Sequence, residues 1–354
     1  VESVDDSLFD LAERAESNAM QTEYFDGMRE VRKKRQLVER LVNERTTRAF
    51  SDFAEAAAFV RAACGYPVVV KPVWGAGSKN VSFCRNEEEF ADAFIRVQET
   101  PDAYLQQSSD VLVEKYISGD EYVVNMMGTA DGVFVTDIWK YEKFGNDYSD
   151  CVYYNDIMQD MNDPYFDALR EYAVKVDHAV GIKIGPAHAE IKLSENGPVM
   201  IEIGSRLAGG EMPKYAAMAT NCNSLEKTLK VFIDGTADMP EKIIINSYPA
   251  SADISHEKFG RLVRINGLEK VRRLKTYTAE VLYAKEGDYI EPTRDVDHLA
   301  ALFWFMGTDR AQVRADLEKS HRLCTVTVKN DRVLVVATTT DYVDILRKRY
   351  PDQI

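Results

Sequence analysis

Apolar and polar residues alternate in two short runs that lie close together in the chain, residues 189–193 and 199–203. An alternation with a period of two predicts β-strands that each have one buried face. Glu195, Asn196 and Gly197 stand between the runs. They suit a three-residue hairpin loop with Gly197 in the left-handed conformation. The pattern therefore predicts an antiparallel hairpin with a fixed register.

This register brings two carboxylates together, because Glu190 faces Glu202 across the predicted hairpin. Carboxylates directly opposite each other repel and destabilise a strand pair unless something compensates. A hard divalent cation such as Mg²⁺ takes oxygen ligands and is usually shared with phosphates. A solvated polar face is the alternative interpretation, since antiparallel sheets commonly expose one face. Met200 is expected on the same face as the two carboxylates. The opposite face is expected to carry six apolar residues: Ala189, Ile191, Leu193, Val199, Ile201 and Ile203.

The segment that follows, residues 204–210, favours anion binding. Its sequence Gly-Ser-Arg-Leu-Ala-Gly-Gly combines the guanidinium of Arg206 with backbone that can approach an anion closely. If the strand continues as extended backbone, Arg206 projects from the same face as Glu202. This arrangement favours the metal interpretation of the carboxylate pair.

The rest of the pattern predicts strands mixed with helices. Ser51 is expected to cap the first helix, and Asn86 opens the second. Residues 145–162, which are rich in Asp and Asn, are expected to form a mobile loop. The predicted strands are 46–50, 66–72, 81–84, 110–116, 132–140, 262–265, 278–284, 323–328 and 332–338. The predicted helices are 28–42, 52–64, 87–98, 164–180, 211–235, 295–306 and 309–319.

Lys71 ends the apolar strand 66–72, on the same face as Val69. Lysine is almost never fully buried unless it is paired, so a lysine in this place points to a ligand. The glycine-rich stretch 75–78 then joins two predicted strands. It is neither a Walker loop nor a dinucleotide-binding loop, because both of those lead into a helix. A glycine-rich hairpin can still cover phosphates with its backbone N–H groups.

Composition and charge narrow the class of protein. The chain has 354 residues, of which 45% are hydrophobic and 29% charged, enough for two or three packed units. A net charge of −14 argues against nucleic acid or an anionic membrane as the main partner. The five cysteines are scattered and form no CxxC motif, so neither a disulfide framework nor a structural zinc site is indicated. With an acidic N-terminus and no membrane-spanning apolar run, a cytoplasmic location is expected.

Three separated motifs resemble the ATP-grasp superfamily, and within it the L-amino-acid ligases, which join two free amino acids. They are VVVKP with GAGS, VEKYISGDEYVVN, and HAEIKL with VMIEIGSRLAGG. The resemblance spans residues 28–215 and implies an α/β (α+β) fold in which two α+β subdomains grip ATP. It implies the end of an N-terminal domain and a linker helix in 1–45, a central subdomain with the glycine-rich hairpin in 46–116, and a C-terminal subdomain with the metal site and a lid-like tail in 117–354. The family's preceding α/β domain is expected to be largely absent.

The resemblance also implies roles for individual residues in nucleotide binding. Lys71 and Lys143 would contact ATP phosphates, as would Lys34, for which Lys33 or Arg35 are alternatives. The loop over the phosphates would be Gly75, Ala76, Gly77 and Ser78. The segment that holds adenine would be Glu114, Lys115, Tyr116 and Ile117, and Glu121 would hold the ribose.

For metal and substrate, the resemblance implies Glu190 and Glu202 as metal ligands and Arg206, with Lys71, as the catalytic residues. The backbone of Gly209 and Gly210 would border the amino-acid site. The sequence departs from the family at Gly204, where many members have Asn as a further metal ligand. His188 either supports Glu190 or is a hydrogen-bonded core histidine.

The implied function is an ATP-dependent ligase that joins a carboxylate to an amine through an acyl phosphate and releases ADP and phosphate. ATP and Mg²⁺ or Mn²⁺ are the implied cofactors, and amino acids the implied substrates; a homodimer is left open. One alternative is an ATP-grasp ligase for a different acid or amine. A phosphotransferase is another, against which the absence of HRD and DFG motifs argues. A non-catalytic nucleotide-binding protein is the third, against which Lys71, Glu190 and Glu202 argue.

Overall fold

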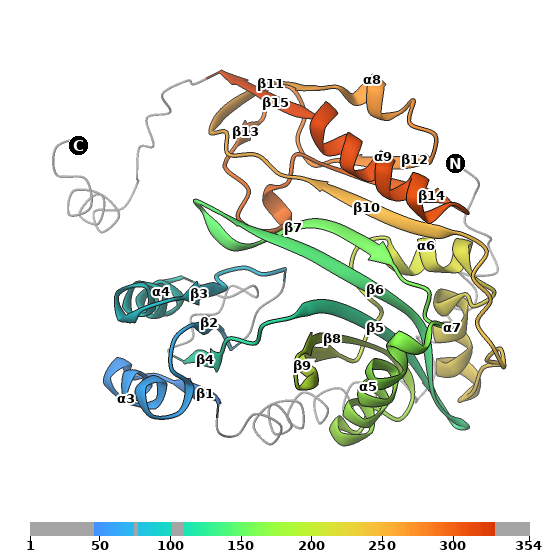
Figure 1. Cartoon of the computed structure of the whole chain (residues 1–354), viewed down its shortest axis with the longest axis horizontal. Helices are drawn as coiled ribbons and strands as arrows, with labels where there is room; N and C mark the ends of the chain where they lie inside the picture. Colours follow the sequence, from blue (N-terminus) through green and yellow to red (C-terminus); the bar gives the residue numbers. More distant parts are fainter. Residues whose placement is uncertain (1–45, 74–76, 101–109, 330–354) are drawn as a thin grey trace.

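The structure is a computed structural model that describes residues 46–73, 77–100 and 110–329. Lys33, Lys34, Arg35, Gly75 and Ala76 lie outside these residues, as do the predicted helix 28–42 and strand 332–338. The described chain forms three antiparallel sheets with helices packed against them (Figure 1). The mixed α/β class predicted from the sequence is confirmed. Every helix of the described residues is too short or too polar to cross a membrane.

The first sheet has four strands in the order β1-β4-β2-β3. They are β1 (Thr47–Phe50), β2 (Val68–Pro72), β3 (Ser82–Cys84) and β4 (Val111–Lys115). Helix α3 (Phe53–Phe59), its π-helical continuation η1 (Val60–Cys64) and helix α4 (Glu87–Glu99) cover it. In β2 the alternation is as predicted: Val68 and Val70 are fully buried, whereas Lys71 is half-buried on the other face. The cap of α3 is Asp52, not Ser51, since its side chain accepts the N–H of Glu55 at 2.9 Å.

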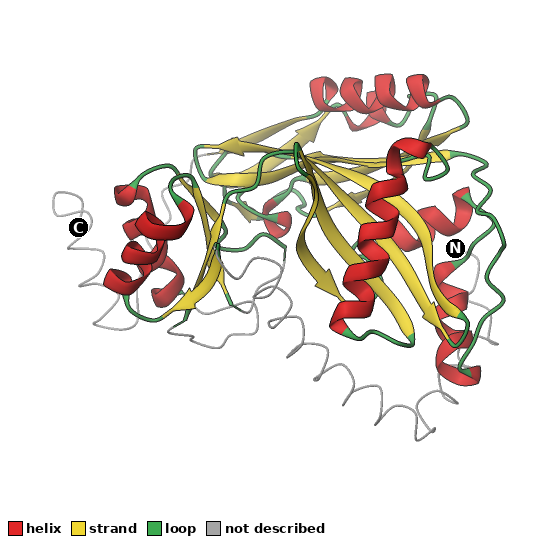
Figure 2. Cartoon of the chain, turned by 60° about the horizontal axis from the view of Figure 1, so that its bottom comes forward, coloured by secondary structure: helices red, strands yellow, loops and turns green. Residues whose placement is uncertain are grey.

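The second sheet has eight strands in the order β12-β14-β10-β7-β6-β5-β8-β9. Their bounds are β5 (Asp120–Thr129), β6 (Gly132–Asn146), β7 (Ser149–Met158), β8 (Gly185–Ser194), β9 (Gly197–Gly204), β10 (Tyr248–Ile254), β12 (Tyr277–Leu282) and β14 (Ala301–Gly307). A third, small sheet has the order β13-β11-β15, from β11 (Gly260–Asn266), β13 (Tyr289–Ile290) and β15 (Thr325–Lys329). Figure 2 shows the large sheet beside the smaller four-stranded one, each with its own helices.

Helices cover both faces of the large sheet. Helices α5 (Asp167–Val180), preceded by η2 (Pro164–Phe166), and α9 (Arg310–Leu323) pack on one face. Helix α6 (Met212–Ala219) packs on the opposite face, which we call the α6 face. The sheet residues buried beneath α6 are Val123, Trp139, Met158, Leu302 and Trp304. The remaining helices are α7 (Ser224–Asp234), α8 (Leu268–Val271) and η3 (Val296–His298).

The predicted loop 145–162 is wrong, because most of it is strand β7 between β6 and β10. Polar residues of β7, such as Asn155, form hydrogen bonds inside the protein. Asn155 is completely buried, donates from Nδ2 to Glu142 Oε2 at 2.7 Å, and lies 2.9 Å from His321 Nε2. Polar composition therefore misled the prediction, since these side chains serve internal hydrogen bonds.

Two helix predictions are also wrong. Residues 295–306 hold the short helix η3 and then strand β14, whose apolar run lies between β10 and β12 and is buried on both faces. A short continuous apolar run does not distinguish a buried strand from a buried helix. The helix predicted at 211–235 is two helices, α6 and α7. The chain breaks at Thr220, which bridges to Ile245, and Asn223 caps α7.

Candidate active site

The hairpin of β8 and β9 places Glu190 directly opposite Glu202, as predicted. The loop is tighter than predicted, because Ser194 already pairs with Gly197. A bulge at Ile201 restores the register before the carboxylates. The bulge also changes which side chains are buried: the core beneath α5 takes Met200, whereas Val199 and Ile201 are only half-buried. The assignment of Met200 to the carboxylate face was therefore wrong.

Two lysines from different sheets lie in ion pairs that are largely shielded from solvent. Lys71 of β2 is 2.7 Å from Glu114 of β4, and Lys143 of β6 pairs with Glu121 of β5. The Lys143 ammonium also lies over the Tyr153 ring, 4.4 Å from its centroid. Burial alone would lower the pKa of Lys143, but nearby carboxylates, Glu121 foremost, hold it well above its ordinary value. Both predicted phosphate-binding lysines of the described chain are thus held in place by carboxylates.

The charges of Lys71 and Lys143 both act on Glu190. Burial would raise the pKa of its carboxyl group, but a hydrogen bond from His188 and the charges of Lys143 and Lys71 outweigh burial and lower the pKa to about 2. Glu190 pairs with Val123 of the α6 face, so the carboxylate projects from that face. The site therefore holds an ionised carboxylate between a lysine of the four-stranded sheet and a lysine of the eight-stranded sheet.

A buried polar chain stands behind Glu190. His188 is 3% exposed; its Nε2 lies 3.4 Å from Glu190 Oε1, and its Nδ1 lies 3.2 Å from Asn125 Oδ1. Asn125 in turn donates from Nδ2 to Asp137 Oδ1 at 2.6 Å. The two interpretations of His188 are thus both met, since it is a buried hydrogen-bonded histidine that also orients Glu190. Asn125 and Asp137 carry no sequence signal of their own, as each lies in an otherwise ordinary strand.

The glycine-rich hairpin between β2 and β3 reaches across to the large sheet. Gly77 and Ser78 have φ values of 63° and 60°, in the left-handed region. A Cβ on Gly77 would lie 2.9 Å from Val296 Cγ2 of η3, so this contact requires glycine. Lys79 pairs with Asp297 of the same short helix. The loop that was predicted to cover phosphates therefore packs against the C-terminal part of the chain.

A second contact fixes the base of the same hairpin. The backbone N–H of Phe83 donates to Asp150 Oδ2 at 3.1 Å, and Arg85 Nη2 lies 2.7 Å from Asp150 Oδ1. Asp150 belongs to β7, and sequence reasoning missed it because its strand had been taken for a loop. One aspartate thereby joins the four-stranded and the eight-stranded sheets.

In the segment predicted to hold adenine, the Glu114 carboxylate pairs with Lys71. The backbone N–H groups of Lys115 and Tyr116 donate to Thr46 O at 2.8 Å and to Pro67 O at 3.2 Å. These bonds fix the chain where it leaves the four-stranded sheet and, at Ile117, passes towards β5. Adenine binding at this segment stays a prediction.

Strand β9 ends at Gly204 and the chain bends at Ser205 and Arg206, so the alternation that predicted the direction of Arg206 stops before it. Arg206 is exposed and donates to Leu207 O at 2.8 Å; it forms no ion pair with a described residue. A Cβ built on Gly209 or Gly210 would meet no atom within 4 Å. The guanidinium of Arg206 and the uncovered backbone of Gly209 and Gly210 thus follow the strand that carries Glu202.

Glu190 and Glu202 fit a hard divalent cation. They offer carboxylate oxygens only, one of them ionised by its surroundings, which suits Mg²⁺ or Mn²⁺ shared with phosphates and water. Within the described ranges no cluster of three or more His, Cys, Asp or Glu side chains has metal-site geometry. Two carboxylates without imidazole or thiolate favour magnesium over zinc.

Comparison with known proteins identifies a domain within the chain. A model of the ATP-grasp domain matches residues 64–214, and one described as the N-terminal domain of a protein of unknown function matches residues 1–63. The chain is 34% identical to dapdiamide A synthase of Enterobacter agglomerans over 148 residues, 42% of this chain and 35% of that protein. It is 23% identical to an L-arginine-specific L-amino acid ligase of Bacillus subtilis over 170 residues, 48% of this chain and 41% of that protein.

The chain thus spans less than half the length of these curated relatives in the matched regions. The crystal structure of an L-amino acid ligase from Bacillus licheniformis superposes on 84% of this chain and 72% of its own, with a TM-score of 0.70 at 19% identity, which shows a shared fold. Residues 64–214 therefore match the ATP-grasp domain, and the chain shares its fold with an L-amino acid ligase.

Proposed function

We propose that this ATP-grasp ligase joins the carboxylate of one amino acid to the amine of another through an acyl phosphate, releasing ADP and phosphate. The observation that carries the proposal is the convergence of Lys71 and Lys143, from different sheets, on the ionised Glu190 that faces Glu202. Phosphoryl transfer needs positioned cations and neutralised charge more than it needs a protein nucleophile.

In this proposal ATP lies between the two sheets. Lys71 and Lys143 exchange their carboxylate partners for phosphate oxygens, and Glu121, released from Lys143, accepts the ribose hydroxyls. Glu190 and Glu202 would hold Mg²⁺ or Mn²⁺, which would neutralise charge on the phosphates. The same proposal includes two subdomains, residues 46–116 and residues 117–354, that bind ATP between them.

The chemistry then runs in two steps. A substrate carboxylate oxygen attacks the γ-phosphorus, and the bond to the bridging oxygen breaks, giving an acyl phosphate and ADP. An amine nitrogen next attacks the acyl carbon; the carbon–oxygen bond breaks, phosphate leaves, and the amine gives up a proton. Arg206 follows strand β9, which carries Glu202, and its guanidinium donates to Leu207 O and forms no ion pair with a described carboxylate. It is therefore suited to bind the oxyanion of both steps.

A second candidate is a ligase for a carboxylate or amine outside the free amino acids. It is favoured by one comparison, since the relative with 34% identity is named for a different product, dapdiamide A. The L-arginine-specific ligase supports amino-acid substrates instead. Both candidates share the acyl-phosphate chemistry and differ in the substrates alone.

The test uses the full chain with ATP, MgCl₂ and pairs drawn from the proteinogenic amino acids. ADP and phosphate released in equal amounts with a dipeptide, identified by mass spectrometry, would support the proposal. Hydroxylamine added with a single amino acid traps an acyl phosphate as the hydroxamate and so names the acid partner. ATP turnover that needs a non-amino-acid carboxylate or amine would favour the second candidate, and the absence of nucleotide binding would contradict both.

A further inference from the structure

Two aspartates share the α6 face with the proposed metal ligands. Asp156 of β7 pairs with Tyr141 of β6, which pairs with Glu121 of β5. On the other side Asp156 pairs with Ser251 of β10. Paired residues of antiparallel strands project from the same face, so this row crosses the sheet from the proposed nucleotide site to β10. Asp253 lies two residues beyond Ser251 and therefore projects from that face as well.

Both aspartates have carboxylate oxygens without a partner. Asp253 is 5% exposed, and its Oδ2 accepts no hydrogen bond from any described residue. Asp156 accepts from Ser251 Oγ through Oδ2 at 3.1 Å, but its Oδ1 is buried and without a hydrogen bond within the described chain. Neither forms an ion pair with a described lysine, arginine or histidine. Buried polar atoms are rarely left unsatisfied in native proteins, so these oxygens point to a group that is not part of this chain's described residues.

The electrostatics show what kind of group is missing. Burial raises the pKa of Asp253 well above its ordinary value, and the charge of Asp156 raises it further. Burial likewise raises the pKa of Asp156 to about 7, although the hydrogen bond from Ser251 and the charge of Lys143 act in the opposite direction. Two buried carboxyl groups side by side cannot both ionise cheaply unless a cation, or a shared proton, stands between them. The unsatisfied groups are therefore acceptors that need positively charged donors.

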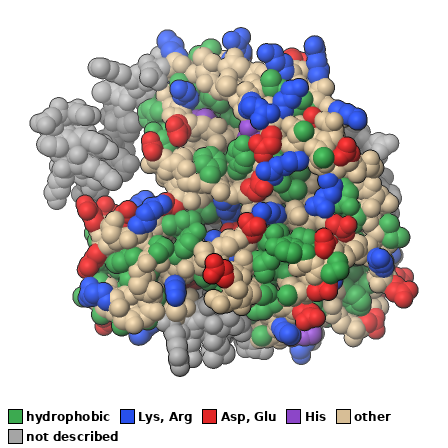
Figure 3. All heavy atoms as spheres, viewed as in Figure 1, with side chains coloured by type: hydrophobic (Ala, Val, Ile, Leu, Met, Phe, Trp, Pro, Cys, Tyr) green, Lys and Arg blue, Asp and Glu red, His purple; other side chains and the backbone are tan. Residues whose placement is uncertain are grey.

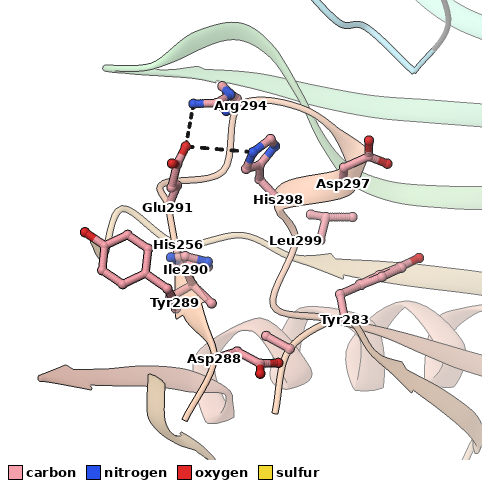
Figure 4. A pocket seen from close by; sticks show the side chains of 11 residues that line it. His256, Tyr283, Asp288, Tyr289, Ile290, Glu291, Arg294, Asp297, His298 and Leu299 are labelled. Carbon is pink, nitrogen blue, oxygen red and sulfur yellow. Dashed lines mark ion pairs between the residues drawn. The ribbon is translucent and has the colours of Figure 1, made fainter. Parts of the chain in front are cut away.

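A pocket lies beside strand β13 of the third sheet, and neither Asp156 nor Asp253 lines it. Its volume is about 530 Å³, and it is lined among others by Tyr283, Glu291, Arg294 and His298. Tyr283 links the pocket to the aspartates: burial raises the pKa of its hydroxyl, and the charges of Asp253 and Asp156 raise it further. Figure 4 shows the Tyr283 ring extending away from the Tyr289 side of the pocket, while Glu291 pairs with Arg294 and His298. Figure 3 shows basic side chains gathered along the upper edge of the molecule.

We infer that Asp156 and Asp253 form a binding site for the ammonium or guanidinium group of an amino-acid substrate. The inference rests on the proposed function and names the end of the site that the amine-bearing substrate occupies. An ammonium carries three donors, which match Asp156 Oδ1, Asp253 Oδ2 and the Ser251 hydroxyl as an acceptor. A divalent metal fits less well, because no third carboxylate or imidazole of the described chain completes a metal cluster here.

The cation has two chemical sources, the α-ammonium group of any amino acid or the side chain of a basic one. Amino-acid amides test binding of the ammonium group alone, because they keep that group and lack the carboxylate. N-acetyl amino acids do the opposite. L-Lysinamide and L-norleucinamide differ in the side-chain ammonium group and so distinguish the two sources.

The experiment is isothermal titration of the full chain with MgADP present, using L-alaninamide, L-lysinamide, L-norleucinamide and N-acetyl-L-alanine as probes. Asp253→Asn and Asp156→Asn are expected to weaken binding of the amides about 10- to 100-fold, as for loss of a charged hydrogen bond. Binding of N-acetyl-L-alanine is expected to stay unchanged. An effect on L-lysinamide alone assigns the side chain, and an equal effect on all three amides assigns the α-ammonium group.

The matched control is Asp177→Asn. Asp177 is also a buried aspartate without a hydrogen-bond partner for its carboxylate in the described chain, but it lies on α5, on the opposite face of the sheet. This variant should leave all four affinities unchanged. Melting temperatures show that each variant is folded, and two independent aspartates keep the test valid if one variant fails.

Amide affinities that are equal in wild type and both variants, or wild type that binds no amide, would overturn the inference and leave the two carboxyl groups sharing a proton. Failure of the proposed function looks different. In that case the amides bind through the aspartates, yet no acid and amine pair releases phosphate from ATP.

Discussion

Two carboxylate pairs lie on one face of one sheet and have opposite electrostatics. Glu190 faces Glu202 on neighbouring strands, and its pKa is lowered to about 2. Asp156 and Asp253 lie across β7 and β10, and the pKa of each is raised, that of Asp156 to about 7. Glu190, Glu202 and Asp156 are half-buried and Asp253 is buried, so the degree of burial alone does not explain the difference. At Glu190 the hydrogen bond from His188 and the charges of Lys143 and Lys71 outweigh burial, whereas at Asp156 the hydrogen bond from Ser251 and the charge of Lys143 do not. At Asp253 no described group offsets burial.

The origin of those cations shows how the site is assembled. Lys71 comes from the four-stranded sheet, Lys143 from the large sheet, and the hydrogen bond of His188 from the same strand as Glu190. Residues of both sheets thus help to keep Glu190 charged, with the hydrogen bond from His188 contributing most. At the other pair Lys143 offsets burial only in part, and in our inference the remaining positive charge comes from the substrate.

The largest effect should follow from neutralising the first pair. Glu190→Gln and Glu202→Gln are each expected to lower ATP-dependent phosphate release by about 10³-fold or more, since each removes an oxygen ligand for the metal that neutralises the transferring phosphate. Steady-state phosphate release and Mn²⁺-dependent nucleotide binding measure this. Full activity in either variant would show that the hairpin carboxylates do not bind metal.

Glu190→Gln and Glu202→Gln should also differ in thermal stability. Repulsion between the carboxylates alone would predict a higher melting temperature for both variants without Mg²⁺. The low pKa of Glu190 predicts a lower melting temperature for Glu190→Gln, because the folded protein stabilises that charge. Glu202→Gln lacks this penalty, so the two variants should separate in a thermal melt, and identical shifts would contradict the argument.

Arg206 should show the next largest effect. Arg206→Ala is expected to lower kcat by about 10²- to 10³-fold, more than it raises the KM for ATP, because the arginine would meet charge that grows in the transition state. Arg206→Lys should rescue poorly, since a point charge does not reproduce a two-pronged donor. Kinetics with ATP and each amino acid varied in turn are the measurement. A change in the KM for ATP alone would move Arg206 to the nucleotide site.

Lys71 gives a smaller effect that the structure makes more specific. Lys71→Ala should weaken ATP about 10- to 100-fold, more than adenosine, because it removes a phosphate partner and leaves Glu114 unpaired near the phosphates. Adding Glu114→Gln should recover part of the loss by removing that repulsion. Glu121→Ala should weaken both ligands through the ribose. Titrations with ATP and adenosine test this, and equal losses for both ligands in Lys71→Ala would make the lysine structural.

The sequence was most informative where local rules determine the structure. The hairpin at Glu190 and Glu202 was predicted correctly because alternation and a short loop fix which residues face each other, even though a bulge at Ile201 does part of that work. Lys71 was recognisable for the same reason, as a charge ending an apolar strand. These features depend on neighbours in sequence.

The remainder of the site depends on neighbours in space. Asp150, Asp156 and Asp253 carried no signal, because their strands are central in the sheet and their polarity resembled that of a loop. The strand β14 was taken for a helix because its apolar run is buried on both faces and shows no alternation. The roles of Asp156 and Asp253 can be predicted only if β7 and β10 are known to be neighbouring strands. The sequence of either strand alone does not contain this information.

The smallest effect comes from a carboxylate that belongs to neither pair. Asp177 on α5 is fully buried, and both of its oxygens lack a hydrogen bond within the described residues. Burial raises its pKa from 3.8 to about 7. Between these values the folded protein holds a proton that the unfolded chain has lost, so this group makes stability fall as pH rises from about 4 to about 7. Glu190 acts in the opposite sense, since its contribution is present above its ordinary pKa and is lost as pH falls towards 2.

Asp177→Asn removes the ionisation without changing the shape of the side chain. The variant should therefore melt a few degrees above wild type at pH 8, where wild type pays for a buried charge or for protonating it, since about 1 kcal/mol corresponds to roughly 2–4 °C in a domain of a few hundred residues. At pH 3 the difference should nearly vanish, because both the folded and the unfolded wild type then carry the proton. Thermal melts of both proteins at the two pH values are the measurement. A shift of the same size at both would mean that the substitution acts through packing, and a lower melting temperature at pH 8 would mean that the ionised carboxylate has a partner.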